Sequence, residues 1–406
     1  MANQLLTISM ITTESARILS NNLVLSKVVN RDFDDEFGIP DAKIGQTVNV
    51  RKPARYNLRT GSIVDLQAQT ETYAPLVFTN PVGVDLDFTS QEKTFSLDRY
   101  SERVIKPAVV RVANGIDALG YNQMYQFYGY QGTPGTALTA ATSQAAILNG
   151  IAKLYDKDCP IEDGNISQLN GTAFNAVLSN SNASLFNPMK EISEIYVKGM
   201  QGTFGGANHY MSQLVPSQLG AVYGGTPVTN SATAQTGSSL ITSGWSSGAT
   251  TLQAGNVFTI AGVYAVNPQT KASLSYLQPF TVLTTISDTA GAITASIAPS
   301  IVASGPFQNV SNAAANTQAI TVIGATGVAS QLAIALHRDA LMLANKDLET
   351  PKAVEQGYFV REPDTGVGVR VVEAFDVRTN QLITRLDSMV AWAPLYAELG
   401  VKVFTS

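Results

Sequence analysis

Cysteine and histidine are almost absent from this chain of 406 residues. The sequence contains one cysteine, Cys159, and two histidines, His209 and His337. A single cysteine excludes a disulfide within the chain and a cysteine-rich metal site, and we expect Cys159 to be a small, partly buried hydrophobic residue. The histidines are far apart in sequence and have no partner pattern typical of a catalytic triad. We therefore expect no metal, no cofactor and no enzymatic activity.

Charge is also scarce. Charged residues make up 14% of the chain and the net charge is −5, whereas an average soluble domain has about 25% charged residues. Without a basic excess, tight electrostatic binding of nucleic acid is not expected. The N-terminus lacks the pattern of a signal peptide, and no run of about 18 apolar residues predicts a membrane-spanning helix. These absences predict a protein that is made in a cytoplasm and does not enter a membrane.

What the sequence does contain is a mixture of helical and strand patterns. Apolar residues spaced by three and four predict helices, and alternation of polar and apolar residues predicts strands. Ser96 is a good N-cap for the strongest helix, whereas Pro107 should bend that helix or shift its start. The predicted helices are 5–30, 95–130, 145–155, 188–197 and 330–345. The predicted strands are 46–51, 73–88, 174–178, 208–214, 256–266, 280–286, 319–323, 369–375, 381–386 and 398–404.

The segment 225–328 differs from the rest in composition. Between Lys198 and Arg338 the only charged residues are Lys271 and Asp288, and Ser, Thr, Ala and Gly dominate. Short strands separated by glycine-rich turns predict a small β-barrel. Because mixed helix and strand patterns return after it, this segment is expected to be an insertion within a domain.

The connection Lys52–Thr72 is too long for an ordinary hairpin loop, which has 2–5 residues. The chain's main basic concentration lies here, in Arg51, Lys52, Arg55 and Arg59. One interpretation is a solvated hairpin. The other is a contact between subunits, in which this basic segment meets the acidic cluster of a neighbouring copy, formed by Asp32, Asp34, Asp35 and Glu36. On the second interpretation, reversing Arg55 and Arg59 to glutamate should reduce the yield of assemblies without unfolding the subunit.

Three segments, in this order, resemble one known family. They are Phe95–Ala108 followed by Ala113–Asp117, then Gly255–Pro268, and then Leu336–Leu343. The set is similar to the spine helix, the start of the inserted barrel and the return segment of the P-22-like coat proteins of short-tailed bacteriophages. The resemblance covers nearly the whole chain. It implies an α+β fold of the Hong Kong 97 capsid type, with an inserted small β-barrel domain.

The resemblance also implies a division of the chain and a function. The parts are an N-terminal arm (1–45), an extended loop with peripheral-domain strands (46–88), a spine helix (89–133), an axial domain in two parts (134–224 and 329–360), the inserted β-barrel (225–328) and peripheral-domain return strands (361–406). The implied function is that of a major capsid protein, which self-assembles into hexamers and pentamers of an icosahedral shell around double-stranded DNA. The implied partners are other copies of the chain, a scaffolding protein, a portal protein at one vertex and packaged DNA bound without sequence-specific contact. The implied location is the virion, after assembly in the host cytoplasm.

In one respect the sequence departs from the family. Coat proteins of this type carry a charged loop in the inserted domain that contacts a neighbour, but here that region has only Lys271 and Asp288. We expect apolar and hydrogen-bonded contacts, or another element, to take this role. Two other interpretations stay open: an encapsulin-like protein cage of the same fold, and a cell-surface β-protein suggested by the segment 225–328.

Overall fold

The computed structural model divides the chain into two compact units. The first comprises Met1–Arg51, Tyr73–Tyr121 and Leu341–Ala393, and the second comprises Lys52–Thr72, Asn122–Ala340 and Pro394–Ser406. The residues that the structure describes are 8–31, 47–56, 58–59, 61–62, 64, 66–67, 69, 71–79, 81–89, 105–157, 159–160, 165–184, 202–349, 356–361 and 366–406.

The first unit contains a five-stranded sheet. Its strand order is β18-β21-β20-β19, and β3 pairs with β21 outside this path. The strands are β3 (Val82–Thr89), β18 (Leu341–Lys346), β19 (Gln356–Arg361), β20 (Gly368–Asp376) and β21 (Gln381–Pro394). The turn between β20 and β21 uses Asn380 at a φ of 56°, a left-handed conformation that asparagine tolerates better than most residues.

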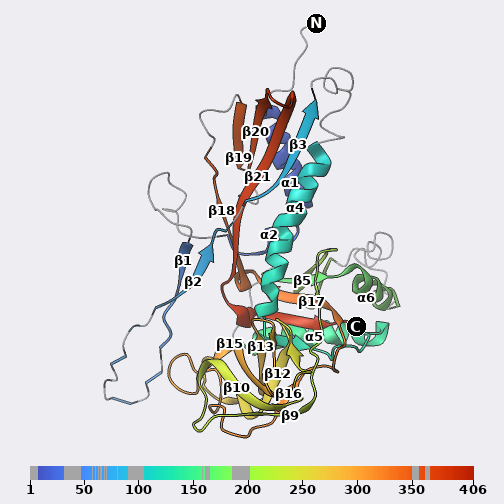
Figure 1. Cartoon of the computed structure of the whole chain (residues 1–406). Coiled ribbons are helices and arrows are strands. Elements are labelled where there is room, and N and C mark those ends of the chain that lie inside the picture. The colour runs from blue at the N-terminus through green and yellow to red at the C-terminus, as the bar shows by residue number, and fades with distance from the viewer. Residues whose placement is uncertain are drawn as a thin grey trace. The chain divides into compact units, whose positions relative to one another are not determined.

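Two helices pack against this sheet and against each other. Helix α1 (Ile8–Asn22) contacts β19 and β20, and α4 (Lys106–Tyr121) contacts β3, as Figure 1 shows. Each helix buries one apolar face, which includes Ile18 and Leu19 of α1 and Val112 and Ile116 of α4. The apolar residues spaced by three and four thus form the core of this unit.

A buried carboxylate joins α4 to the segment that follows α1. Asp117 accepts hydrogen bonds from the backbone N–H groups of Val24 (2.8 Å), Leu25 (3.1 Å) and Ser26 (3.2 Å), and from the Ser26 hydroxyl (2.6 Å). These donors belong to the start of the short helix α2 (Leu25–Val28). Burial raises the pKa of Asp117, and the hydrogen bonds act in the opposite direction.

The second unit contains a seven-stranded mixed sheet. Its order is β4-β22-β17-β5-β7-β6, and β8 pairs with β17. The pairs β22–β4 and β5–β7 are parallel, while β17 is antiparallel to β5, β8 and β22. The strands are β4 (Gly129–Gln131), β5 (Ile166–Asn170), β6 (Thr203–Phe204), β7 (Ala207–Met211), β8 (Ser217–Gln218), β17 (Ser330–His337) and β22 (Gly400–Phe404). Helix α5 (Ala140–Tyr155) packs on β4, β17 and β22, and α6 (Thr172–Ser184) packs on α5.

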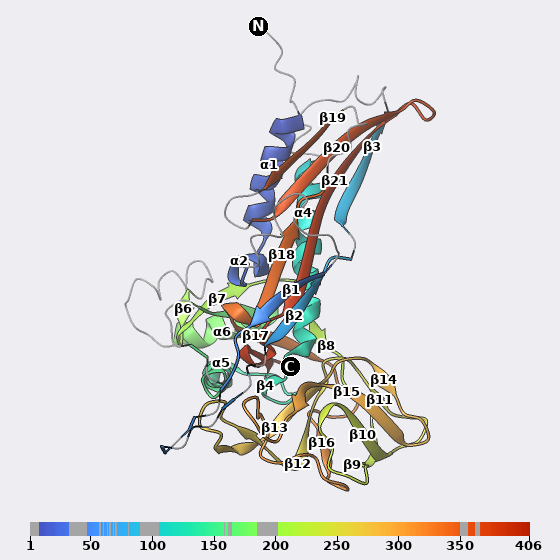
Figure 2. The same cartoon turned by 90° about the vertical axis from the view of Figure 1, so that its left-hand side faces the viewer.

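A six-stranded antiparallel sheet is formed by the segment between β8 and β17. Its order is β16-β12-β13-β15-β10-β9, and Figure 2 shows its strands curving around a common interior. The strands are β9 (Gly225–Thr229), β10 (Gly237–Trp245), β12 (Val257–Val266), β13 (Ser273–Val282), β15 (Ala292–Ile301) and β16 (Ile320–Val322), with a small β11 (Thr251–Leu252) and β14 (Ile286–Ser287) pair. A single bridge from Val228 of β9 to Ala319, next to β16, connects the two edges.

This segment has its own core, and its ends meet. The buried cluster includes Leu240, Phe258, Phe280 and Ile293, and all of its members lie between Ala221 and Val322. The chain enters and leaves side by side, because the N–H of Gly327 donates to the carbonyl of Ala221 at 2.7 Å. A Cβ on Gly220 would lie 2.2 Å from the Val328 carbonyl oxygen, so this close approach of two backbones requires glycine.

The two charged residues of this segment form hydrogen bonds with backbone groups of the same segment. Asp288 accepts hydrogen bonds from the backbone N–H groups of Gly248 (2.9 Å), Thr250 (3.0 Å) and Gly291 (2.9 Å), which lower the pKa of its carboxyl. The ammonium of Lys271 donates to the Pro306 carbonyl at 2.7 Å. Both side chains thus hold turns together.

Many of the predicted elements are confirmed. Helices α1 and α2 lie within 5–30, α5 covers 145–155, and strands occur at 208–211, 257–266, 320–322, 369–375, 381–386 and 400–404. Gly202, Gly205 and Gly206 adopt positive φ angles around β6, and these glycines turn the chain into β7. The predicted helix 188–197 and the predicted N-cap Ser96 lie outside the described residues.

Three sequence predictions are wrong. The segment 330–345 is not a helix but strand β17, a 3₁₀ turn (Arg338–Ala340) and strand β18. Strand β17 is buried almost throughout, and a strand covered on both faces has a continuous apolar run that periodicity cannot distinguish from a buried helix.

The other two errors concern helix type and helix length. Residues 174–178 belong to α6, not to a strand, because Phe174 and Leu178 are four residues apart and share one buried helix face. The helix predicted to reach residue 130 ends at Tyr121 and is followed by a 3₁₀ turn (Asn122–Gln126) and β4. Pro107 lies near the start of α4, two residues after the π-helical Ile105.

Candidate functional site

The long connection between β1 and β2 is the candidate functional site. Strands β1 (Thr47–Lys52) and β2 (Thr72–Val77) pair with each other as a two-stranded sheet. Their alternation buries Val48, Ala74 and Leu76 and turns the intervening residues outward. Pro53 follows β1 directly and lacks the N–H that another ladder bond would need. The chain between these strands is hereafter called the extended loop (residues 53–71).

The extended loop exposes large apolar side chains. Leu58 and Leu66 are each 90% exposed, Val64 is 71% exposed and Tyr56 is 58% exposed. Exposed apolar residues occur singly on most proteins, but four within eleven residues form a surface that gains free energy from being covered. Burying one such leucine contributes roughly 1.5–3 kcal/mol.

The start of the extended loop contacts other residues of the second unit. The guanidinium of Arg55 forms an ion pair with Glu398 at 3.2 Å, and it lies 6.0 Å from the centroid of the Phe307 ring. The ammonium of Lys52 lies 5.2 Å from the centroid of the Tyr396 ring. Burial lowers the pKa of Lys52 and the charge of Glu398 opposes this shift. A partly exposed ion pair such as Arg55–Glu398 contributes only about 0–1 kcal/mol to stability. These contacts therefore orient the start of the loop but hold it weakly.

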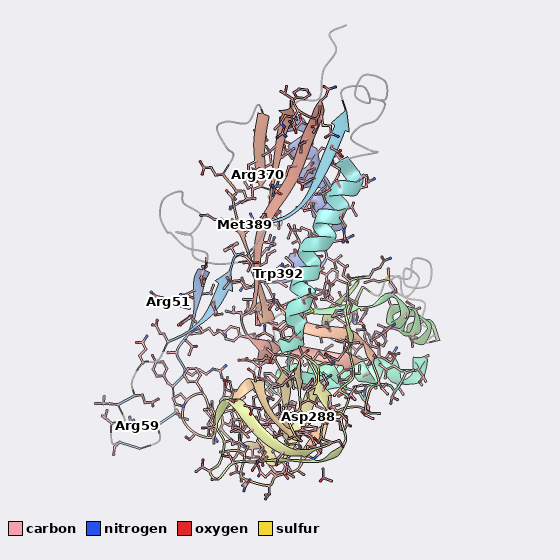
Figure 3. All side chains as sticks on the ribbon, in the orientation of Figure 1. Arg51, Arg59, Asp288, Arg370, Met389 and Trp392 are labelled. Carbon is pink, nitrogen blue, oxygen red and sulfur yellow. The ribbon has the colours of Figure 1, made fainter. Side chains whose placement is uncertain are left out.

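The other predicted basic residues are exposed. Arg51 lies on β1, and Arg59 lies farther along the extended loop, where its guanidinium donates to the Gly61 carbonyl (Figure 3). Their proposed acidic partners, Asp32, Asp34, Asp35 and Glu36, lie outside the described residues. The contact between the two groups therefore stays a prediction.

Sequence reasoning missed two features of this site. It identified the basic residues but not the apolar ones, although Leu58, Val64 and Leu66 stand out as apolar residues in a polar stretch without strand alternation. It also missed Glu398 as the partner of Arg55, since 343 positions separate the two residues. Only the tertiary structure brings such residues together.

The single cysteine and the two histidines of the chain make contacts within the folded units. Cys159 is buried, as expected. His337 accepts a hydrogen bond from the N–H of Asp339 at 3.2 Å, and His209 contacts the Phe204 carbonyl at 3.2 Å. Within the described part of the chain, no three His, Cys, Asp or Glu side chains are grouped so that they could hold a metal ion. None of the described helices has the length and apolar character needed to cross a membrane.

The chain matches a known family over almost its full length. Residues 1–405 match the model of the family described as "P22 coat protein - gene protein 5". No curated protein sequence matches the chain.

Solved structures from bacteriophages align with most of this chain. One from Mycobacterium phage Che8 has a TM-score of 0.50 at 10% identity, covering 94% of this chain and 90% of that one. The mature capsid of bacteriophage PhiM1 has a TM-score of 0.48 at 10% identity, with 94% and 86% covered. The capsid of cyanophage P-SCSP1u has a TM-score of 0.47 at 8% identity, with 94% and 88% covered. The family match, which covers both units, shows that this chain belongs to the P22 coat protein family of bacteriophage structural proteins.

Proposed function

We propose that this chain is the major capsid protein of a tailed bacteriophage, and that it assembles with itself into hexamers and pentamers of an icosahedral shell around double-stranded DNA. Membership of a coat protein family supports a role in the shell. The observation that carries the assembly step is the extended loop, whose apolar side chains are exposed in the isolated subunit. A neighbouring copy that covers Leu58, Val64 and Leu66 would remove this apolar surface from water.

We further propose the Hong Kong 97 type of organisation, with the domain boundaries that the sequence resemblance implies. The extended loop and helix α4 fit the loop and spine of that fold. The inserted β-barrel at 225–328 is supported by the bridge between the edges of the six-stranded sheet and by the adjacent entry and exit of the chain. A segment that has its own hydrophobic core can be inserted into a domain without disturbing the strands on either side.

The remaining partners follow from this role. A shell of this type would be built with a scaffolding protein, would carry a portal protein at one vertex and would hold DNA without sequence-specific contact. A net charge of −5 is compatible with a container that does not bind its contents tightly. The family match favours a phage shell over an encapsulin-like cage of the same fold.

The contact between neighbours can be tested in the extended loop. Replacing both Leu58 and Leu66 by aspartate should leave the subunit folded, because these side chains are exposed, but should prevent closed shells from forming. The measurement is shell yield by size-exclusion chromatography and negative-stain microscopy, with circular dichroism as the test of folding. The matched control is Val377→Asp, a change at an apolar residue that is 81% exposed outside the loop. Normal shells from the double variant would refute the proposed role of the loop.

The basic residues of the loop call for a separate pair of variants. Arg59→Glu reverses an exposed charge and tests the predicted contact with a neighbour, with loss of the hydrogen bond to the Gly61 carbonyl within the loop. Arg55→Glu also places a second carboxylate next to Glu398, so it should release the start of the loop as well. We expect both to lower shell yield without unfolding the subunit, and Arg55→Glu to have the larger effect. If shells form normally from both variants, the basic residues are not interface residues.

A further inference from the structure

The second unit contains a cavity that lies apart from the exposed apolar residues of the extended loop. Its volume is about 300 Å³, which is at the lower end of the range found for small-molecule sites. Its walls come from the β4 segment, helix α5 and the turn after it, strands β12, β13 and β22, and the turn at Glu398. All of these belong to one compact unit.

Aromatic and apolar side chains form most of the cavity wall. Tyr128, Tyr130 and Tyr276 line it, together with Leu277, Pro279 and Val401. Tyrosine rings offer flat apolar faces against which another ring can stack. The walls therefore fit a flat, apolar body about the size of one ring.

Two ammonium groups also line this cavity. The Lys153 ammonium donates to the Tyr130 carbonyl at 2.5 Å and lies 4.7 Å from the centroid of that ring. The Lys157 ammonium donates to Gln278 Oε1 at 3.0 Å and lies 5.9 Å from the ring centroids of both Tyr128 and Tyr276. Burial lowers the pKa of both lysines, that of Lys157 to about 8.

The one carboxylate in the cavity wall, Glu398, acts on Lys157 through its charge and opposes the fall in the pKa of that lysine. Glu398 pairs with Arg55 at 3.2 Å. Among the residues that the structure describes, neither Lys153 nor Lys157 has a carboxylate oxygen within 4.0 Å. The cavity thus presents two ammonium groups beside apolar rings, with Lys157 buried more deeply than Lys153. An anion that entered the cavity would offset the cost of burying these charges.

We propose that this cavity binds a small amphipathic anion, in which a carboxylate is attached to a flat apolar ring. The ring lies against Tyr128 and Tyr276, and the carboxylate accepts hydrogen bonds from the ammonium groups of Lys157 and Lys153. A purely apolar ligand would leave the lysines without a counter-charge, and a large polyanion would exceed the volume of the cavity.

The test is isothermal titration calorimetry of the full-length protein with benzoate, and with benzamide as an uncharged probe of nearly the same shape. Benzoate should bind and benzamide should bind at least about ten-fold more weakly, because hydrogen bonds from an ammonium group to a charged carboxylate are stronger than those to a neutral amide. Equal affinity for both probes, or no binding of benzoate, would overturn the proposal. The titration measures individual subunits, so its outcome does not depend on whether shells form.

Variants of the cavity residues test whether benzoate binds in this cavity. Lys157→Met keeps the length of the side chain but removes its charge, and should weaken benzoate by about ten-fold or more. Leu277→Trp fills the cavity from β13 and should abolish binding by a route that does not involve charge. The control is Lys106→Met, which removes the same charge from an exposed position on α4. If benzoate binds both cavity variants as well as it binds the wild type, the site lies elsewhere.

Discussion

At the scale of single residues, Lys402 is the most unusual side chain in the described structure. It lies in β22 and is completely buried. Its ammonium donates to the carbonyls of Gly255 (2.8 Å) and Tyr125 (3.4 Å) and reaches the Thr281 hydroxyl at 3.5 Å. These acceptors are uncharged, and burial lowers the pKa of Lys402 from 10.5 to about 7. A lysine in the last strand thus ties the seven-stranded sheet to the six-stranded one through carbonyl oxygens.

This burial predicts a pH dependence of stability. In the unfolded chain Lys402 binds its proton up to about pH 10.5, whereas in the folded protein it loses it near pH 7. Between these values the unfolded state holds more protons, so the free energy of unfolding should rise with pH by up to about 1.4 kcal/mol per pH unit. Below pH 7 both states are protonated, and the full cost of burying the charge remains.

The measurement is urea denaturation at pH 7, 8 and 9 on the wild type and on Lys402→Met. The methionine variant should lose this part of the pH dependence, while Lys106→Met, at an exposed position, should keep it. Parallel pH profiles for wild type and Lys402→Met would show that the amine titrates normally in the folded state.

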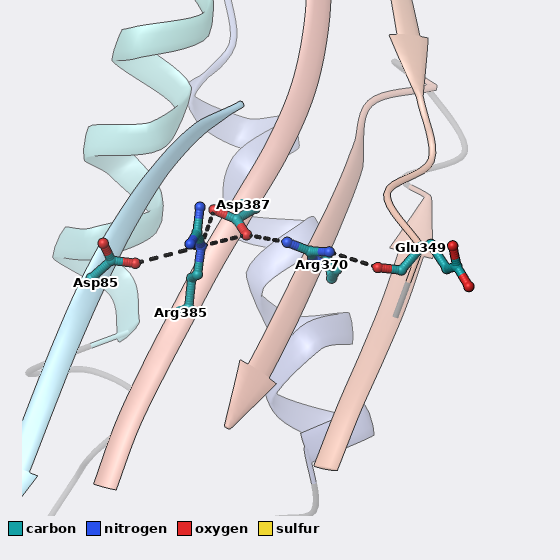
Figure 4. A network of polar contacts seen from close by, with 5 residues as sticks. All are labelled: Asp85, Glu349, Arg370, Arg385 and Asp387. Atoms are coloured by element: carbon teal, nitrogen blue, oxygen red, sulfur yellow. Dashed lines mark hydrogen bonds and ion pairs between the residues drawn. The ribbon is translucent and has the colours of Figure 1, made fainter. Parts of the chain in front are cut away.

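At the scale of elements, a polar network links the strands of the five-stranded sheet. Asp387 of β21 is 2% exposed at its side chain and forms ion pairs with Arg370 of β20 (2.5 Å) and Arg385 of β21 (2.7 Å), as Figure 4 shows. Arg370 also donates to the Glu349 carbonyl at 2.6 Å, and Arg385 lies 3.8 Å from Asp85 of β3. The side chain of Arg370 is 14% exposed, whereas that of Arg385 is 49% exposed. The two arginines should therefore contribute unequally.

Arg370→Met should destabilise the protein by about 3–5 kcal/mol, because it leaves the buried charge of Asp387 with only a half-exposed partner. Arg385→Met removes a partner that is half in water and should cost about 1 kcal/mol or less. Thermal or urea denaturation of the two variants compares them directly. Equal losses of stability would contradict the assignment of Arg370 as the main partner of Asp387.

The elements also show where sequence patterns are sufficient and where they fail. Helices α1, α4 and α5 each bury one face, so a period of 3.6 residues identifies them. Strand β17 lies between β22 and β5 with both faces covered, and its run Leu332–Leu336 carries no alternation. Its partners lie more than 60 residues before and after it in sequence, and no local pattern records that pairing.

At the scale of the whole molecule, the six-stranded sheet is the most self-contained part. Its buried cluster draws every member from residues 221–322, and its two ends are joined by the bond from Gly327 to Ala221. Its contacts with the seven-stranded sheet include those of Lys402 with Gly255 and Thr281 and of Lys157 with Gln278. Apolar side chains of both sheets also line one cavity, among them Leu277 of β13 and Val401 of β22.

Residues 221–327 expressed alone should therefore fold. We expect a β-type circular dichroism spectrum and one cooperative thermal transition. Leu240→Asp, which places a charge in the cluster, should abolish both. A spectrum typical of an unfolded chain from the wild-type segment would show that the sheet depends on the rest of the subunit.

The sequence by itself excluded a disulfide within the chain, because a single cysteine has no second thiol to pair with. It also marked the segment that forms the six-stranded sheet, since the gap in charge between Lys198 and Arg338 is a property of composition. It identified the extended loop by its length and basic residues, and the family by the order of its segments.

Tertiary structure alone decided which of these residues meet. It paired Arg55 with Glu398, buried Lys402 among carbonyl oxygens, and left Leu58 and Leu66 exposed. Burial and ion pairing depend on distances between residues that are far apart in sequence, and those distances exist only after the strands have paired.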